Sequence, residues 1–153
     1  MRVYADTSVF GGCFDDEFIR ASRAFMQQVR AGILSLQTSA LVESELQAAP
    51  DEVRRCFEDA LPWAEFLDIT DAALALQEAY LAMAILSPKW SADALHVALA
   101  TVARCDASIS WNFKHIVHHD KIACYTEVNT KRGYGEIGIY SPSQVITYDE
   151  EEL

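Results

Sequence analysis

Apolar and polar positions alternate along the chain in blocks that indicate short strands between amphipathic helices. The apolar run at residues 3–5 ends at Asp6, and apolar residues at 18, 21, 25 and 29 have the spacing of a buried helix face. This pattern predicts strands at 3–5, 33–37, 106–110 and 136–140. It predicts helices at 15–31, at 51–60 and at 122–129. It also predicts a helix capped by Thr38 or Ser39 that stops before Pro50, one capped by Thr70 or Asp71 that runs to about Leu86, and one capped by Ser91. Residues 63–69 fit either a loop or a weak strand.

Strands that alternate with helices are typical of an α/β fold whose parallel sheet is covered on both faces. With 153 residues, 51% of them hydrophobic, the chain is long enough for one such domain. We expect a single domain over residues 1–147, with an acidic, frayed tail over 146–153. Ligands bind such sheets outside the carboxyl ends of the strands, where Asp6 is expected to lie.

The net charge of −11 restricts how this chain can bind nucleic acid. Most of its surface repels a phosphate backbone, so binding requires a local basic patch or metal ions between acidic groups and phosphate. No apolar run approaches the roughly 20 residues of a membrane span, and the first residues lack a secretion signal. We therefore expect a cytoplasmic protein with no membrane partner. The four cysteines are widely spaced, which indicates free thiols rather than a disulfide framework.

Four positions carry candidate chemistry at places where this architecture brings them together. Asp6 follows the first strand, Glu45 lies in the helix after the second, Asp93 lies in the first turn of the alanine-rich helix, and Asn112 follows the strand DASIS. Each position also has a structural interpretation. Asp6 suits a turn or a helix cap, Asp93 suits a helix start, Glu45 suits a solvated helix face, and Asn112 suits a turn.

Three carboxylates in one crevice repel one another strongly unless a cation lies between them. Hard carboxylate oxygens suit Mg²⁺ or Mn²⁺, which can orient a phosphodiester, generate hydroxide from bound water and stabilise the leaving oxygen. Asp6, Glu45 and Asp93 are thus candidate metal ligands. His96, three residues after Asp93, is interpreted as a satisfied interior histidine. The sequence contains no P-loop. The glycine-rich GYGEIG at 133–138 does not lead into a helix, so it is interpreted as a turn followed by a strand rather than as a dinucleotide-binding motif.

The candidate RNA-facing patch contains Lys114, His115 and Lys121, with the aromatic residues Trp111 and Phe113 just before them in sequence. A core tryptophan next to a solvated loop is the structural alternative. The histidines of HIVHHD also have spacings that zinc can use, although surface or RNA-facing histidines fit the segment better.

The four candidate stretches resemble the motifs of PIN domains, the fold of the VapC-type toxins of bacterial toxin–antitoxin pairs. VYADTSVF resembles the first strand with its metal-binding Asp, TSALVESEL the second motif with its Glu, and SADALHVALA the third motif with its Asp. ISWNFKHI resembles the fourth, with Ser110 at the hydroxyl position and Asn112 at the position of the last Asp. The resemblance covers roughly residues 1–120. It implies a three-layer α/β/α PIN-like fold with a central, mostly parallel sheet.

The resemblance further implies a metal-dependent endoribonuclease, usually dimeric and held inactive by a cognate antitoxin. Mg²⁺ or Mn²⁺ would activate a water that attacks the phosphorus of an RNA phosphodiester. The implied catalytic residues are Asp6, Glu45, Asp93 and Asn112, of which the first three bind the metal. The implied supporting residues are Thr7, Ser8 and Ser110.

Asn112 departs from the family pattern, and this leaves two alternatives open. An amide oxygen can bind a metal but carries no charge, so a second metal site would be weaker. One alternative is a PIN-like module that binds RNA or protein with weak or no catalysis, as Asn112 and the net charge suggest. The other is a metal-dependent phosphoesterase that acts on small substrates.

Overall fold

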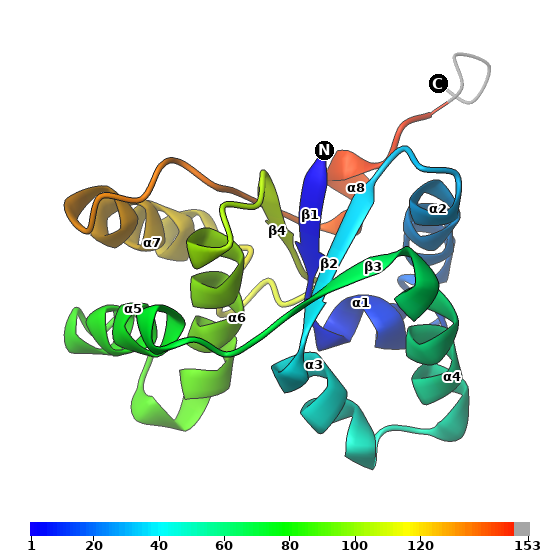
Figure 1. The fold of residues 1–153 in the computed structure, drawn as a ribbon, viewed down its shortest axis with the longest axis horizontal. Coiled ribbons are helices and arrows are strands. Elements are labelled where there is room, and N and C mark those ends of the chain that lie inside the picture. Colours follow the sequence, from blue (N-terminus) through cyan, green and yellow to red (C-terminus); the bar gives the residue numbers. More distant parts are fainter. Residues whose placement is uncertain (149–153) are drawn as a thin grey trace.

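The computed structural model describes residues 1–148 and has one five-stranded sheet between two layers of helices (Figure 1). The strands are β1 (Arg2–Ala5), β2 (Ser35–Ser39), β3 (Ala64–Leu67), β4 (Ala107–Ile109) and β5 (Gly138–Tyr140). They lie in the order β3-β2-β1-β4-β5, and every neighbouring pair is parallel. The predicted α/β fold with a parallel central sheet is therefore confirmed.

Two groups of helices cover the two faces of the sheet (Figure 1). One layer consists of α1 (Thr7–Gly12), α2 (Ile19–Arg30) and α4 (Asp51–Ala60). The other consists of α5 (Asp71–Ala82), α6 (Ser91–Val102) and α7 (His119–Lys131). The remaining short helices are α3 (Ala40–Glu45), α8 (Pro142–Val145) and the 3-10 turns η1 (Leu46–Ala48), η2 (Leu61–Trp63) and η3 (Pro88–Trp90).

The strand order reverses between β1 and β4. From β1 the chain moves outward to β2 and β3, and it then returns to the other side of β1 to form β4 and β5. Ala5 is in register with Ile109, so the carboxyl ends of β1 and β4 lie side by side. The backbone N–H of Asp6 extends this pairing by donating to the Ile109 carbonyl at 3.1 Å. Such a reversal opens a crevice above the strand ends, which is where parallel sheets bind ligands.

The hydrophobic core is built on the two central strands and the helices against them. Tyr4, Phe10, Phe25, Leu36 and Ile109 are among the buried apolar side chains, and full burial of such a side chain contributes about 1.5–3 kcal/mol. Helix α6 is buried at every position from Ala94 to Thr101, because its small alanine side chains allow close packing on all sides.

Local capping explains where several helices begin. The Ser39 hydroxyl accepts from the backbone N–H of Val42 at 3.4 Å, and the Thr70 hydroxyl accepts from that of Ala73 at 3.1 Å. Both residues were alternatives for predicted caps, and both are the caps. The predicted cap at Ser91 is wrong. A 3-10 turn ends at Trp90, which occupies the cap position without a side-chain hydrogen bond, and Ser91 is already helical.

Other differences from the sequence prediction have local causes. Helix α1 was not predicted, because six residues are too few for an apolar period; it begins where Asp6 caps it. The helix predicted over 15–31 begins only at Ile19, after a turn. Helix α5 ends at Ala82 rather than near residue 86, and the chain leaves it through Ala84 at a φ of 56°. Residues Ala64–Leu67 of the ambiguous segment form the edge strand β3.

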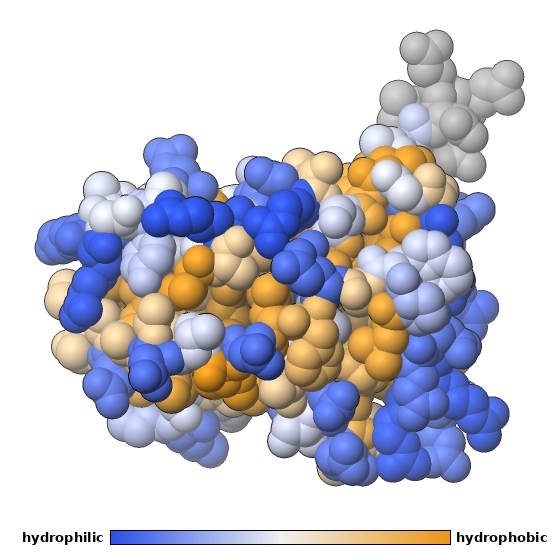
Figure 2. Space-filling model, in the orientation of Figure 1, coloured by the Kyte–Doolittle hydropathy of each residue, from blue (hydrophilic) through white to orange (hydrophobic). Residues whose placement is uncertain are grey.

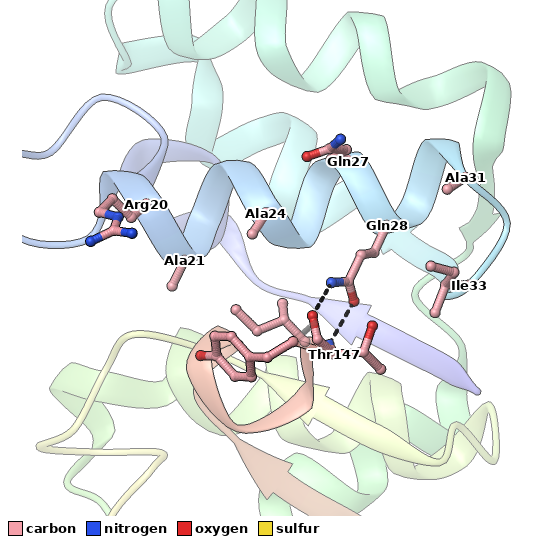
Figure 3. Close-up of a pocket in the computed structure, with 10 residues that line it drawn as sticks. Arg20, Ala21, Ala24, Gln27, Gln28, Ala31, Ile33 and Thr147 are labelled. Carbon is pink, nitrogen blue, oxygen red and sulfur yellow. Dashed lines mark hydrogen bonds between the residues drawn. The ribbon is translucent and has the colours of Figure 1, made fainter. Parts of the chain in front are cut away.

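The segment after α8 packs on α2. The side-chain amide of Gln28 donates to the Thr147 carbonyl at 2.9 Å and accepts from the Thr147 N–H at 3.0 Å (Figure 3). Ile146 is 8% exposed. Residues 146–148, expected to begin a frayed tail, are therefore held in place, and the rest of that predicted tail, 149–153, lies outside the described residues. A cavity of about 670 Å³ lies between this segment and α2, away from the strand ends that carry the candidate site.

The face that carries β3 has apolar side chains at its centre, between polar groups on either side (Figure 2). Trp63, Phe66 and Ile69 are 49%, 43% and 38% exposed. Glu65 and Asp68 lie between them in sequence and keep charge along this edge of the sheet. Within residues 1–148, no helix has the length and apolar character that crossing a bilayer requires.

Candidate active site

Asp6 lies at the point where the strand order reverses. It is the cap of α1, and its Oδ1 accepts from the Ser8 N–H at 3.0 Å and from the Ser8 hydroxyl at 2.5 Å. Its Oδ2 accepts from the Ser110 hydroxyl at 2.5 Å. The residue is only 5% exposed. Burial raises the pKa of Asp6, although His96 and the hydroxyls of Ser110 and Ser8 act in the opposite direction.

Ser8 and Ser110 connect the Asp6 carboxylate to the segment that follows β4. Each hydroxyl donates to Asp6 and accepts a backbone N–H: Trp111 donates to Ser8 and Asn112 donates to Ser110, both at 2.9 Å. Both oxygens of the carboxylate are thereby oriented by hydroxyls that cannot rotate freely. The supporting positions expected for Ser8 and Ser110 are therefore adjacent to Asp6.

Close packing holds the same segment against α1 and α2. The Trp111 indole N–H donates to the Ser22 hydroxyl at 2.8 Å, and its ring stacks on Phe18 with 4.2 Å between centroids. Gly12, at the end of α1, leaves the space for this contact. A Cβ built at Gly12 would lie 2.3 Å from the Ser22 Oγ and 2.6 Å from the Trp111 indole nitrogen.

Glu45 is the last residue of α3, and its Oε1 is held by two donors. The Thr7 hydroxyl donates to it at 2.8 Å, and His96 Nε2 donates at 2.5 Å. Burial acts to raise the pKa of Glu45. The hydrogen bond and charge of His96 and the hydrogen bond of Thr7 together lower it by more, so the net shift is downward. Thr7 follows Asp6 directly, so it joins Glu45 to the start of α1.

His96 is an interior histidine whose ring nitrogens both have partners. It is 2% exposed, and its Nδ1 lies 2.7 Å from the Tyr4 hydroxyl, which in turn lies 2.9 Å from the Ser39 hydroxyl. The interpretation of His96 as a satisfied interior histidine is therefore confirmed. Its partner Glu45 was not foreseen, because the contact joins residues 51 positions apart. The network of Tyr4, Ser39 and His96 orients Glu45 from within the core.

Asp93 lies in the first turn of α6 and also contacts a histidine. His115 Nδ1 donates to Asp93 Oδ2 at 2.9 Å, with the two side chains 10% and 22% exposed. The His115 ring packs against Trp90 with 4.5 Å between centroids, and the His115 carbonyl accepts from the Tyr125 hydroxyl at 2.9 Å. His115, predicted to face RNA, is thus largely enclosed and oriented towards Asp93.

Asn112 forms a turn. Its Oδ1 accepts from the Lys114 N–H at 3.2 Å and from the His115 N–H at 2.9 Å. The side-chain oxygen expected to position a metal is therefore used by the backbone that leads to His115. Lys114 is exposed, whereas the Lys121 ammonium group donates to the Ile85 carbonyl at 2.5 Å.

Asp6 thus follows β1 and caps α1, Glu45 ends α3, and Asp93 lies in the first turn of α6. Within residues 1–148, no group of three or more His, Cys, Asp or Glu is close enough to hold a metal ion. The donors nevertheless have the chemistry of a Mg²⁺ or Mn²⁺ site. Asp6 is a buried carboxylate with hydroxyl partners, and no described residue hydrogen-bonds to Glu45 Oε2 or Asp93 Oδ1.

The sheet order and the two helical layers define a PIN-like α/β fold. One solved structure with this fold is VapBC2 from Rickettsia felis bound to a DNA fragment from its promoter, with a TM-score of 0.53 and 13% identity over 92% of this chain and 98% of the matched chain. A second is FitAcB from Neisseria gonorrhoeae, with a TM-score of 0.60 and 11% identity over 94% of this chain and 99% of the matched chain. No family model and no curated protein matches the sequence. The resemblance to VapC-type PIN domains is confirmed at the level of the fold.

Proposed function

We propose that this chain is a metal-dependent endoribonuclease and the toxin of a toxin–antitoxin pair. One observation carries the proposal: a buried carboxylate, Asp6, is held by two hydroxyls where the strand order reverses. A buried carboxylate without a strong cationic partner costs stability. Such a cost at the usual ligand crevice of the fold is typical of a functional site.

Asp6, Glu45 and Asp93 are the residues that would hold Mg²⁺ or Mn²⁺. When bound, such an ion supplies an activated water and charge stabilisation at a phosphodiester. The chain itself supplies orientation. Thr7 and His96 hold Glu45 Oε1, and His115 holds Asp93 Oδ2, so the second oxygen of each carboxylate has no hydrogen bond from a described residue.

The exposed Lys114, next to the Asn112 turn, would contact an RNA backbone near this site. On a chain with a net charge of −11, so few local cations together with a metal would give weak, salt-sensitive binding. His115 would contribute by positioning Asp93, and Lys121 by tethering α7 to the Ile85 carbonyl.

The proposed partners are a cognate antitoxin and a second copy of the chain, in the cytoplasm. The fold match to VapBC2 and FitAcB supports this assignment. Size-exclusion chromatography with light scattering on the purified chain distinguishes a dimer from a monomer, before any antitoxin is added.

The test is incubation of the purified chain, free of antitoxin, with mixed RNA and Mn²⁺. Parallel reactions contain EDTA, the Asp6→Ala variant, or the Asp16→Ala variant as a matched control. Asp16 is exposed and makes no side-chain hydrogen bond within residues 1–148, so its variant should cut like the wild type. We expect cleavage that is lost with EDTA and with Asp6→Ala.

Two other outcomes point to the remaining alternatives. A folded protein that binds RNA or a protein without cutting RNA would identify a PIN-like binding module. The engagement of Asn112 Oδ1 by the backbone favours this alternative over the next. Hydrolysis of small phosphoesters with RNA left intact would identify a phosphoesterase.

A further inference from the structure

The layer of α1, α2 and α4 (Figure 1) also carries a second group of reactive side chains, which does not include Asp6, Glu45 or Asp93. A cavity of about 540 Å³ opens between these helices. Its lining includes two thiols, three guanidinium groups and two carboxylates, from Cys13, Cys56, Arg23, Arg30, Arg55, Glu52 and Asp59. None of these residues takes part in the proposed nuclease site.

Helix packing places the two thiols on the same cavity. The rings of Phe10 on α1 and Phe57 on α4 meet edge to face, with 5.4 Å between centroids. Cys13 follows at the end of α1, and Cys56 directly precedes Phe57, so the same contact holds both thiols. Cys13 is 3% exposed, whereas Cys56 is only partly buried and accessible from the cavity.

The charges around the pair make the two thiols unequal. Contact with the Cys13 thiol lowers the pKa of Cys56, and the positive charges of Arg30 and Arg23 lower it as well. Burial and the negative charge of Asp59 act in the opposite direction, but the net shift is downward. Contact with Cys56 and burial raise the pKa of Cys13. Cys56 is therefore the more acidic thiol of the pair and the better nucleophile, and Cys13 is the less acidic one.

We propose that Cys13 and Cys56 form a redox modification site, which closes into an intramolecular disulfide when a peroxide enters the cavity. The Cys56 thiolate attacks one peroxide oxygen, the O–O bond breaks, and the departing hydroxide takes a proton to leave as water. The product is a sulfenic acid on Cys56.

The Cys13 sulfur then attacks the Cys56 sulfur, the S–S bond forms, and the S–O bond breaks. The hydroxyl group leaves with the Cys13 proton as water, so two thiols are oxidised and one peroxide is reduced to two waters. A dithiol reductant reverses the reaction.

The disulfide would brace α1 against α4. Helix α1 carries Thr7 and Ser8 in its first turn, and Cys13 is the residue that caps its other end, so the bond would fix that end. Cross-linking two segments well separated in sequence restricts the unfolded chain, and the oxidised protein should melt several degrees above the reduced protein. The other two cysteines do not line this cavity: Cys105 is buried and Cys124 is exposed.

The test uses the Cys124→Ser variant, so that the exposed thiol does not react. The protein is treated with hydrogen peroxide, unreacted thiols are alkylated, and intact and digested mass spectra are recorded. We expect a monomer that has lost two hydrogen atoms, with one linked pair of peptides containing Cys13 and Cys56. A dithiol reductant should reverse the change. Adding Cys56→Ser should slow loss of thiol by about tenfold.

A further variant separates the two steps. With Cys13→Ser, the Cys56 sulfenic acid has no resolving thiol and should be trapped by dimedone. Oxidation of Cys105 instead, cross-linked dimers as the main product, or a Cys56 no more reactive than Cys105 would each overturn the proposal. The assay measures thiols and melting temperature only, so its failure is independent of whether the chain cuts RNA.

Discussion

His96 Nε2 lies 2.5 Å from Glu45 Oε1 while His96 Nδ1 lies 2.7 Å from the Tyr4 hydroxyl. One imidazole thus joins the central strand β1 to the last residue of α3. His96 is 2% exposed, so water reaches neither ring nitrogen without opening the core, whereas the Glu45 side chain itself is 34% exposed. The position of a candidate catalytic carboxylate therefore depends on the packing of the sheet.

Replacing His96 by Phe should destabilise the protein by about 1–3 kcal/mol, because the Tyr4 hydroxyl and Glu45 each lose a buried partner. Urea denaturation measures this change. Glu43→Gln on the same short helix is the matched control, since Glu43 is exposed, and its effect should stay within about 0.5 kcal/mol. Equal stability of the two variants would mean that the His96 network contributes nothing.

Asp6→Asn should stabilise the metal-free protein at neutral pH. The pKa of Asp6 is raised in the folded state, mainly by burial, so the contribution of Asp6 to stability decreases as pH rises from its unfolded pKa of about 3.9 towards its folded pKa. Asn keeps an oxygen that can cap α1 but removes the buried charge. The gain should shrink below about pH 4. Urea denaturation from acid to neutral pH in EDTA measures it, and a variant less stable than wild type throughout would contradict the burial cost.

Glu45→Gln should show the opposite pH dependence. The pKa of Glu45 is lowered in the folded state: burial acts to raise it, but His96 and Thr7 lower it more. Its contribution to stability is therefore present above the unfolded pKa of about 4.3 and is lost as pH falls through the folded pKa. The variant should be less stable than wild type at neutral pH and approach it in acid. If the stability difference from wild type changed with pH in the same way for Glu45→Gln and Asp6→Asn, the opposite pKa shifts of the two carboxylates would be contradicted.

Gly12→Ala should destabilise the protein by about 1–3 kcal/mol, because its Cβ meets the Ser22 hydroxyl and the Trp111 indole. The neighbouring Gly11 provides a matched control, since a Cβ there has no atom within 4 Å. Gly11→Ala should be neutral or stabilising by up to about 1 kcal/mol. Thermal unfolding of both variants, with tryptophan fluorescence to follow Trp111, tests whether the close approach matters.

Asn112→Asp should tighten Mn²⁺ binding without changing the fold. A carboxylate can accept the same backbone hydrogen bonds from Lys114 and His115 that the Asn112 amide oxygen accepts, and it adds a negative charge near Asp6. Isothermal titration with Mn²⁺ measures affinity, and circular dichroism checks the fold. Unchanged affinity would show that position 112 acts only in its turn.

Periodicity sufficed for most elements because long amphipathic segments carry their own signal. The helix over 51–60 was predicted correctly, and Ser39 and Thr70 are the caps out of two alternatives that local residues offered for each helix. Helix α1 was missed because its six residues contain too few positions to show a helical period of apolar residues. Ser91 failed as a cap because η3 displaces the helix start, and that turn depends on Pro88.

The sequence by itself determined the alternating α/β pattern and the placement of Asp6 and Asn112 after strands, because both depend on neighbouring residues. It also placed Asp93 in the first turn of a helix. Only the tertiary structure decided that Glu45 pairs with His96 and Asp93 with His115, and that Cys13 shares a cavity with Cys56. These contacts join residues that are far apart in the chain. They depend on how the helices pack on the sheet, and neighbouring residues in a single sequence carry no signal for that packing.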